Sequence, residues 1–255
     1  MKLFSLEGKT AIVTGAGRGI GRSIALGLAE AGSNVVVCSR TTSELEELAV
    51  EIKAKGVEAL VVPCDIQNPA AIDHVIQQTM DQFGSIDVLI NNAGITKKHP
   101  AEEYPLEDWN QILNVNLTGV FLFAQKVGQV MLNQGQGSII NISSVASKQA
   151  VTKSIAYGAT KGGVNMLTKT FASEWADKGV RVNGIAPAYI ETPLVLAVKN
   201  HREGFAEDII NRTPMKRMGK PEEIVGAAIF LASEASSYVT GETIFVDGGW
   251  TAIGL

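Results

Sequence analysis

The chain contains little of what several protein classes require. Only two cysteines occur among its 255 residues, and Cys38 and Cys64 each lie inside or just after an apolar run. This usage favours reduced core thiols over a disulfide framework, and we expect a reducing, cytoplasmic compartment. The three histidines, His74, His99 and His201, are widely scattered and neither cysteine joins a ligand-like cluster, so we expect no metal site.

Positive charge and long apolar runs are also scarce. The formal net charge is −4 and the isoelectric point of the sequence is about 5.5, so the chain has no cationic footprint for nucleic acid or an anionic membrane. No apolar run approaches the ~18 residues of a membrane-spanning helix, and the opening apolar residues give way to Glu7-Gly8-Lys9 before a signal peptide could form. We therefore expect no nucleic-acid partner, no membrane partner and no export.

Short apolar, often β-branched runs alternate along the chain with segments of helical spacing, of which 72–83 is the clearest. This alternation indicates right-handed βαβ units. It predicts an α/β fold with a single doubly wound, Rossmann-type domain over residues 1–255, in which helices cover both faces of a parallel sheet of about seven strands. The expected strands are 10–13, 34–37, 59–62, 88–90, 138–142, 180–185 and 243–246.

The least regular part of the chain is 187–221, which is rich in proline, charge and small residues. Irregular segments of this kind often carry function on a rigid scaffold. We expect it to form a mobile lid over a substrate site.

A glycine-rich turn follows the first expected strand. Glycines at such a turn let the backbone approach a pyrophosphate, which is held by unpaired N–H groups at the start of the next helix. The spacing is Gly15-x3-Gly19-x-Gly21 and departs from the usual G-x-G-x-x-G, and a turn without a ligand is the alternative interpretation. The residues expected to bind a dinucleotide here are Gly15, Arg18, Gly19, Ile20 and Gly21.

The end of the second expected strand indicates which dinucleotide fits. An acid that would bind the ribose 2′-hydroxyl of NAD is absent, and Ser39 is followed instead by Arg40. The Arg40 guanidinium, with Arg18 as a second cation, can hold a 2′-phosphate, so the sequence favours NADP(H) while NAD(H) stays possible. The alternative is that Arg40 is a solvated residue at a helix start. Asp65 and its neighbour Ile66 are expected at the adenine, although Asp65 can also cap its own loop.

Tyr157 and Lys161 are four residues apart in the helical segment 155–166, so both side chains project from one face. An ammonium beside a phenol favours the phenolate, and we expect it to bring the phenol pKa toward neutrality for acid/base work. Such a pair can also be an ordinary surface pair. Ser144 favours the acid/base interpretation over the surface pair. It follows the strand 138–142, and ligands of open α/β sheets bind beyond the carboxyl ends of the strands.

At this point the sequence resembles the short-chain dehydrogenase/reductase family across nearly its whole length. The resemblance rests on the glycine turn, Asn91-Asn92-Ala93-Gly94, Val115-Asn116-Leu117, Ser144, Tyr157-x3-Lys161, and Pro187 with Thr192.

The family resemblance implies roles for individual residues. Tyr157 would be the general acid/base, Ser144 would orient the reacting oxygen, Lys161 would hold the nicotinamide ribose, and Asn116 would support a proton-relay water. Ala188 replaces the glycine that is usual after the proline, and its methyl could narrow the approach of the cofactor. The resemblance further places at the cofactor Asn92, Gly94, Pro187, Ile190 and Thr192.

Within the family, segments 3–9, 95–100 and 246–250 look like those of gluconate 5-dehydrogenases and 2-deoxygluconate 3-dehydrogenases, which act on sugar acids. Lys97, Lys98 and His99 could then face a substrate carboxylate, or could simply be solvated charges. Two other functions stay open: a 3-oxoacyl-carrier-protein reductase, and a catalytically silent dinucleotide-binding sensor. The family resemblance also implies a homotetramer.

Overall fold

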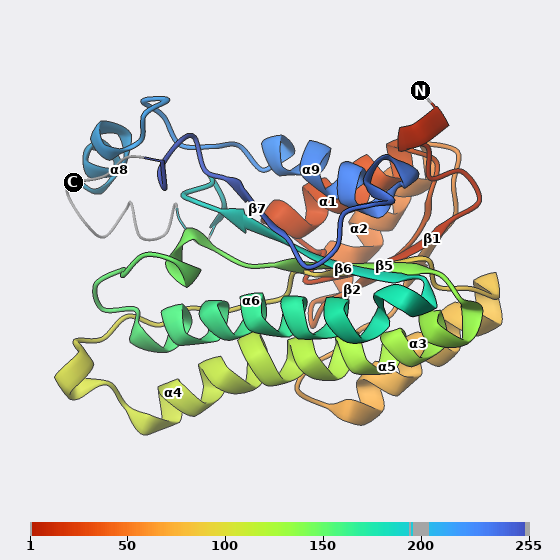
Figure 1. The fold of residues 1–255 in the computed structure, drawn as a ribbon, viewed down its shortest axis with the longest axis horizontal. Coiled ribbons are helices and arrows are strands. Elements are labelled where there is room, and N and C mark those ends of the chain that lie inside the picture. The colour runs from red at the N-terminus through yellow and green to blue at the C-terminus, as the bar shows by residue number, and fades with distance from the viewer. Residues whose placement is uncertain (1, 194, 196–203, 253–255) are drawn as a thin grey trace.

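Seven parallel strands form one twisted sheet between two layers of helices in the computed structural model, which describes residues 2–193, 195 and 204–252 (Figure 1). The strand order is β3-β2-β1-β4-β5-β6-β7, which confirms the doubly wound α/β prediction. The chain order reverses between β1 and β4, so a ligand-binding crevice is expected beyond the carboxyl ends of these strands. The strands are β1 (Thr10–Thr14), β2 (Asn34–Cys38), β3 (Ala59–Val61), β4 (Val88–Asn91), β5 (Gly137–Ile142), β6 (Val180–Pro187) and β7 (Thr243–Val246).

The helices bury the apolar side chains of the sheet on both faces. On one face lie α1 (Gly19–Glu30), α2 (Thr42–Lys53) and α9 (Glu222–Ala232). On the other lie α3 (Pro69–Phe83), α5 (Val120–Gln134) and α6 (Ile155–Trp175) (Figure 1). Burial raises the pKa of the Cys38 thiol and brings that of Cys64 to about 11, as expected for unreactive core thiols. Short 3₁₀ helices are η1 (Lys2–Phe4), η2 (Ala101–Glu103), η4 (Val145–Ser147), η5 (Ala176–Lys178) and η6 (Glu234–Ser236).

Helix α4 (Leu106–Leu113) runs into α5 through the π-helical turn η3 (Asn114–Gly119). Together they form a helix of 29 residues, Leu106–Gln134, that is long and apolar enough to cross a membrane by length and composition alone. Half of its apolar window is buried against the sheet and α6, as in the core helix of a globular domain. The π turn inserts one residue into the helical register, a feature that often marks a functional site.

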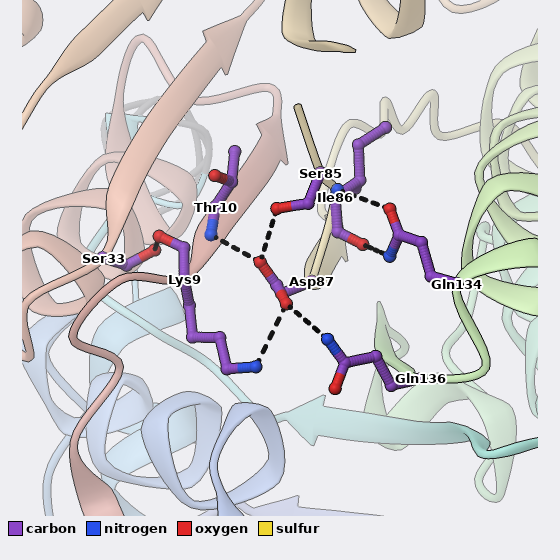
Figure 2. A network of polar contacts seen from close by, with 8 residues as sticks. All are labelled: Lys9, Thr10, Ser33, Ser85, Ile86, Asp87, Gln134 and Gln136. Atoms are coloured by element: carbon purple, nitrogen blue, oxygen red, sulfur yellow. Dashed lines mark hydrogen bonds and ion pairs between the residues drawn. The ribbon is translucent and has the colours of Figure 1, made fainter. Parts of the chain in front are cut away.

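A buried carboxylate joins the amino ends of the central strands (Figure 2). Asp87 precedes β4, and its side chain accepts hydrogen bonds from Thr10 N at 2.9 Å and from Ser85 Oγ at 3.2 Å. Lys9 Nζ lies 3.1 Å from the same carboxylate, and Gln136, the residue before β5, donates to it. The network therefore fixes β1, β4 and β5 in register at the edge opposite the expected crevice.

The segment 187–221, expected to be a lid, lies beyond the end of β6. Residues 194 and 196–203 of this segment are outside the described residues. In the remainder, Ile190 pairs with Gly219, and α8 (Phe205–Arg212) packs beside Trp250 in a third hydrophobic cluster. Whether the segment moves as a lid stays a prediction.

Candidate active site

A cleft of about 320 Å³ opens at the carboxyl edge of the sheet, where the strand order reverses. It gathers residues from segments that are far apart in the sequence, and most of the expected site residues line it. These are Gly15, Arg18, Gly19, Ile20, Ser39, Arg40, Asp65, Ile66, Asn92, Gly94, Ser144, Tyr157, Lys161, Pro187, Ile190 and Thr192.

The glycine turn packs closely against the segment that follows β4. Gly15 and Gly19 have φ of 63° and 57°, in the left-handed region where a side chain is strained. A Cβ on Gly15 would lie 2.9 Å from Ala93 Cα. Arg18 is the N-cap of α1 and makes no side-chain cap, so the N–H groups of the first turn are not capped by it. This geometry fits the pyrophosphate of a dinucleotide.

The side-chain amide of Asn92 stabilises the glycine turn. Its Nδ2 donates to the carbonyl oxygens of Thr14 at 2.9 Å and of Gly15 at 3.0 Å. Gly21 lies outside the lining and packs here, because a Cβ on it would come within 2.3 Å of Asn92 Nδ2 and 2.4 Å of Gly15 O. Asn92 and Gly21 therefore shape the turn.

Polar and charged groups line the cleft where β2 ends. Ser39 Oγ accepts a hydrogen bond from Thr41 N at 3.3 Å, which bends the chain there. Arg40 lines the same part of the cleft, and Arg18 reaches it from the glycine turn. Asp65 also lines the cleft while its carboxylate accepts from Gln67 N at 3.0 Å, so both roles expected for it are compatible with its position.

Tyr157, Ser144 and Lys161 converge at the other end of the cleft. Tyr157 hydrogen-bonds to Ser144, which extends from β5 and whose Oγ accepts from Ala146 N at 3.2 Å. Lys161 is 4% exposed, and its Nζ donates to Ile142 O at 2.6 Å and lies 5.6 Å from the Tyr157 ring centroid. Tyr157 and Lys161 thus project from the same face of α6, as their four-residue spacing predicts.

The titration of this group differs from the expectation. Burial raises the pKa of Tyr157 above its usual value, only partly opposed by the hydrogen bond with Ser144, whereas a lowered pKa was expected. Burial lowers the pKa of Lys161 to about 8. The physical reason is that desolvation disfavours both charged forms, and the Lys161 ammonium is directed to a backbone carbonyl.

Asn116 lies in the π turn and is fully buried. Its Oδ1 accepts from Ile95 N and its Nδ2 donates to Ile95 O, both at 2.8 Å. The side chain therefore fixes the segment after β4, of which Ala93, Gly94 and Ile95 line the cleft. Its expected part in a proton relay stays a prediction.

Lys97, Lys98 and His99 lie outside the lining of the cleft. Lys97 donates a hydrogen bond to Asp108 of α4, and His99 Nε2 is 2.7 Å from the same carboxylate. These interactions lower the pKa of Asp108, Lys97 first among the causes. Lys98 stands 5.6 Å over the ring of Phe205 in α8 and is the one of the three directed toward the expected lid.

Sequence reasoning missed Glu44, which lines the cleft, and Tyr189, whose neighbours Ala188 and Ile190 line it. Glu44 lines it from the first turn of α2 and lies 3.7 Å from Arg18. Tyr189 acts electrostatically on Tyr157 and packs between Phe205 and Trp250 at ring distances of 5.9 and 5.0 Å. Tyr189 could have been suspected from its place two residues after Pro187, whereas Glu44 carries no signal beyond its charge.

Comparison with known proteins agrees with this geometry. The family described as "Enoyl-(Acyl carrier protein) reductase" matches residues 15–251. A 2-dehydro-3-deoxy-D-gluconate 5-dehydrogenase of Bacillus subtilis is 44% identical over 97% of this chain and 96% of its own. A 3-oxoacyl-[acyl-carrier-protein] reductase of Synechocystis is 42% identical over 96% and 98%. The crystal structure of a gluconate 5-dehydrogenase from Burkholderia cenocepacia, in complex with NADP and tartrate, is 42% identical, covers 99% of each chain and has a TM-score of 0.95.

Proposed function

Because the chain belongs to the short-chain dehydrogenase/reductase family and is an NAD(P)-dependent oxidoreductase acting on CH–OH or C=O groups, we propose that its substrates are sugar acids of the gluconate and keto-gluconate class. The observation that carries the reaction is the convergence of Ser144, Tyr157 and Lys161 in one cleft with the glycine turn. The sugar-acid proposal is supported by the relatives named for such substrates.

The residues of the cleft divide the chemistry between them. A bound nicotinamide dinucleotide supplies or accepts the hydride. Tyr157 gives its hydroxyl proton to the developing alkoxide during reduction and takes a proton during oxidation, while Ser144 orients the reacting oxygen. Lys161 holds the nicotinamide ribose. Asn116 supports the water that returns the proton to Tyr157.

NADP(H) is the preferred dinucleotide in this proposal, and NAD(H) is the weaker alternative. Arg40 and Arg18 offer two guanidinium groups for a 2′-phosphate, and neither Ser39 nor Thr41 carries a charge that opposes it. NADP in the Burkholderia cenocepacia enzyme supports the same choice. Ile190 and Thr192 would contact the nicotinamide end of the dinucleotide in this proposal, since both line the cleft.

We propose that the basic segment of Lys97, Lys98 and His99 contributes to binding of the substrate carboxylate. Lys98 lies over the ring of Phe205 in the expected lid, 187–221. Lys97 and His99 interact with Asp108, which fixes the loop that carries all three residues. The lid would close over the sugar acid and exclude water during hydride transfer.

A turnover screen tests the function directly. Purified protein is assayed with NADPH and NADH against keto-gluconates, 3-oxoacyl thioesters and simple ketones. Preferential reduction of keto-gluconates supports the proposal. Preference for acyl thioesters would assign the chain to the 3-oxoacyl-carrier-protein reductases, the alternative supported by the Synechocystis relative. Dinucleotide binding with no turnover of any carbonyl would assign it to the sensors.

We also propose a cytoplasmic homotetramer without nucleic-acid or membrane partners. Helices α5 and α6 carry partly exposed apolar side chains on the outer face of their layer, among them Phe121 and the largely exposed Met166. Such faces are commonly covered by a second copy. Sedimentation at micromolar concentration checks the assembly, and a mass near the 27.0 kDa of one chain would contradict it.

A further inference from the structure

Glu44 reaches out of α2 into the glycine turn. Its carboxylate lies against Gly17, where an added Cβ would come within 2.5 Å of Oε2. Its Oε1 is 3.7 Å from Arg18 Nη1, and the two side chains are 34% and 71% exposed. A negative charge therefore lies at the same turn that is expected to hold the phosphates of a dinucleotide.

Glu44 lies at the end of the cleft that is nearest to the end of β2. It lines the cleft together with Ser39, Arg40 and Thr41, at the end of β2 where the adenosine ribose binds in doubly wound folds. A carboxylate in this place can accept a hydrogen bond from a free 2′-hydroxyl, and it repels a 2′-phosphate. It also partly neutralises Arg18, one of the two guanidinium groups available to that phosphate.

We propose that Glu44 is a specificity-determining residue that limits the preference for NADP(H) and preserves binding of NAD(H). The inference rests on the proposed role of Arg18 and Arg40 at the 2′-phosphate. Arg40 and Arg18 attract the phosphate, and Glu44 opposes it by its own charge and by its pairing with Arg18. Discrimination between NADP(H) and NAD(H) therefore depends on opposite charges near the adenosine ribose, those of Arg40 and Arg18 on one side and that of Glu44 on the other.

A purely structural role for Glu44 makes a different prediction. An acid in the first turn of a helix is stabilised by the helix dipole, so Glu44 could serve only the start of α2. In that case its neutralisation would lower the stability of the fold and leave the discrimination between the two dinucleotides unchanged. The two roles are separated by measuring the ratio of two affinities.

Glu44→Gln tests the proposal because it removes the charge and keeps the shape of the side chain against Gly17. Glu47→Gln is the matched control, because Glu47 is exposed one turn further along α2. The probes are adenosine 2′,5′-bisphosphate and 5′-AMP, which differ only in the 2′-phosphate, and their affinities are measured by titration calorimetry. The kcat/KM ratio for NADPH over NADH gives a second readout.

Glu44→Gln is expected to raise the affinity for the bisphosphate relative to 5′-AMP by about 1.5- to fivefold, as for a partly exposed charge contact, while Glu47→Gln leaves the ratio unchanged. An unchanged ratio in Glu44→Gln would overturn the inference. A lower ratio would overturn it too, because Glu44 would then serve to position Arg18. Wild-type preference for NADH would refute only the proposed NADP(H) preference, since the shift in ratio is measured independently of it.

Discussion

Lys161 on α6 donates a hydrogen bond to the carbonyl oxygen of Ile142, the last residue of β5, over 2.6 Å. The same strand leads directly into Ser144, which hydrogen-bonds to Tyr157. The hydrogen bond from Lys161 therefore joins α6 to the end of β5, beside the segment that carries Ser144.

Tyr157→Phe is expected to lower kcat by about 10²- to 10⁴-fold, because it removes the hydroxyl that transfers the proton and keeps the ring. The dissociation constant for the dinucleotide, measured by fluorescence titration, should change little. A kcat close to that of the wild type would remove Tyr157 from the chemical step.

Lys161→Met is expected to change how stability depends on pH. The pKa of Lys161 is about 8 in the folded chain and 10.5 when unperturbed, so between these values the unfolded chain binds the extra proton. Wild-type stability should therefore rise, relative to the variant, by roughly 2–4 kcal/mol as the pH increases from 8 to 10.5. Urea unfolding of both proteins across this window measures the difference. Parallel curves would show that Lys161 titrates normally.

Arg40→Ala should weaken the binding of NADPH by about tenfold to somewhat over a hundredfold, because it deletes a charge-assisted contact to the 2′-phosphate. The binding of NADH should change little. Ser39→Asp should move the preference toward NADH, since a carboxylate there repels the phosphate and accepts from the 2′-hydroxyl. Steady-state kinetics with both dinucleotides give the answer. A higher kcat/KM for NADH in the wild type would mean that Arg40 does not read the phosphate.

Gly21→Ala should abolish dinucleotide binding and destabilise the protein, because its Cβ would collide with Gly15 O and Asn92 Nδ2. Gly226→Ala in α9 is the control, since a Cβ there meets no atom within 4 Å, and it should raise stability by up to ~1 kcal/mol. Thermal unfolding and NADPH titration of both variants check the pair. Normal binding by Gly21→Ala would contradict the packing role.

Asp87→Ala should lower the free energy of unfolding by about 1–3 kcal/mol, because it leaves the buried Thr10 N–H without its acceptor. Lys9→Ala, which removes a partly exposed partner of the same carboxylate, should cost less than ~1 kcal/mol. Urea unfolding measures both changes. Equal losses would show that the ion pair, rather than the backbone hydrogen bond, supplies the stability.

The sheet was predictable from the sequence because its strands are apolar on both faces and separated by helical spacing. The expected strand 180–185 extends in the structure to Pro187, and the bounds of the others agree within one residue. Tyr157 and Lys161 were equally accessible, since their separation alone puts them on one helix face. In these cases the information is local.

Other features depend on contacts that no local pattern contains. Asp108, which lies in a different segment, interacts with both Lys97 and His99. The sequence does not show this interaction, which reduces the ability of these two side chains to bind a substrate. Glu44 enters the cleft from the helix after β2, although an acid is expected at the end of the strand itself. The raised pKa of Tyr157 also follows from burial, which the spacing of two residues cannot reveal.

The Asp87 network (Figure 2) and the cleft occupy opposite edges of one sheet, joined by β1, β4 and β5. Heat tolerance and substrate choice can consequently diverge independently in descendants of this sequence. A lineage can acquire a new substrate specificity by altering loops at the carboxyl edge while Asp87 continues to hold the strands in register. The same separation tells an engineer where to insert stabilising substitutions without altering turnover.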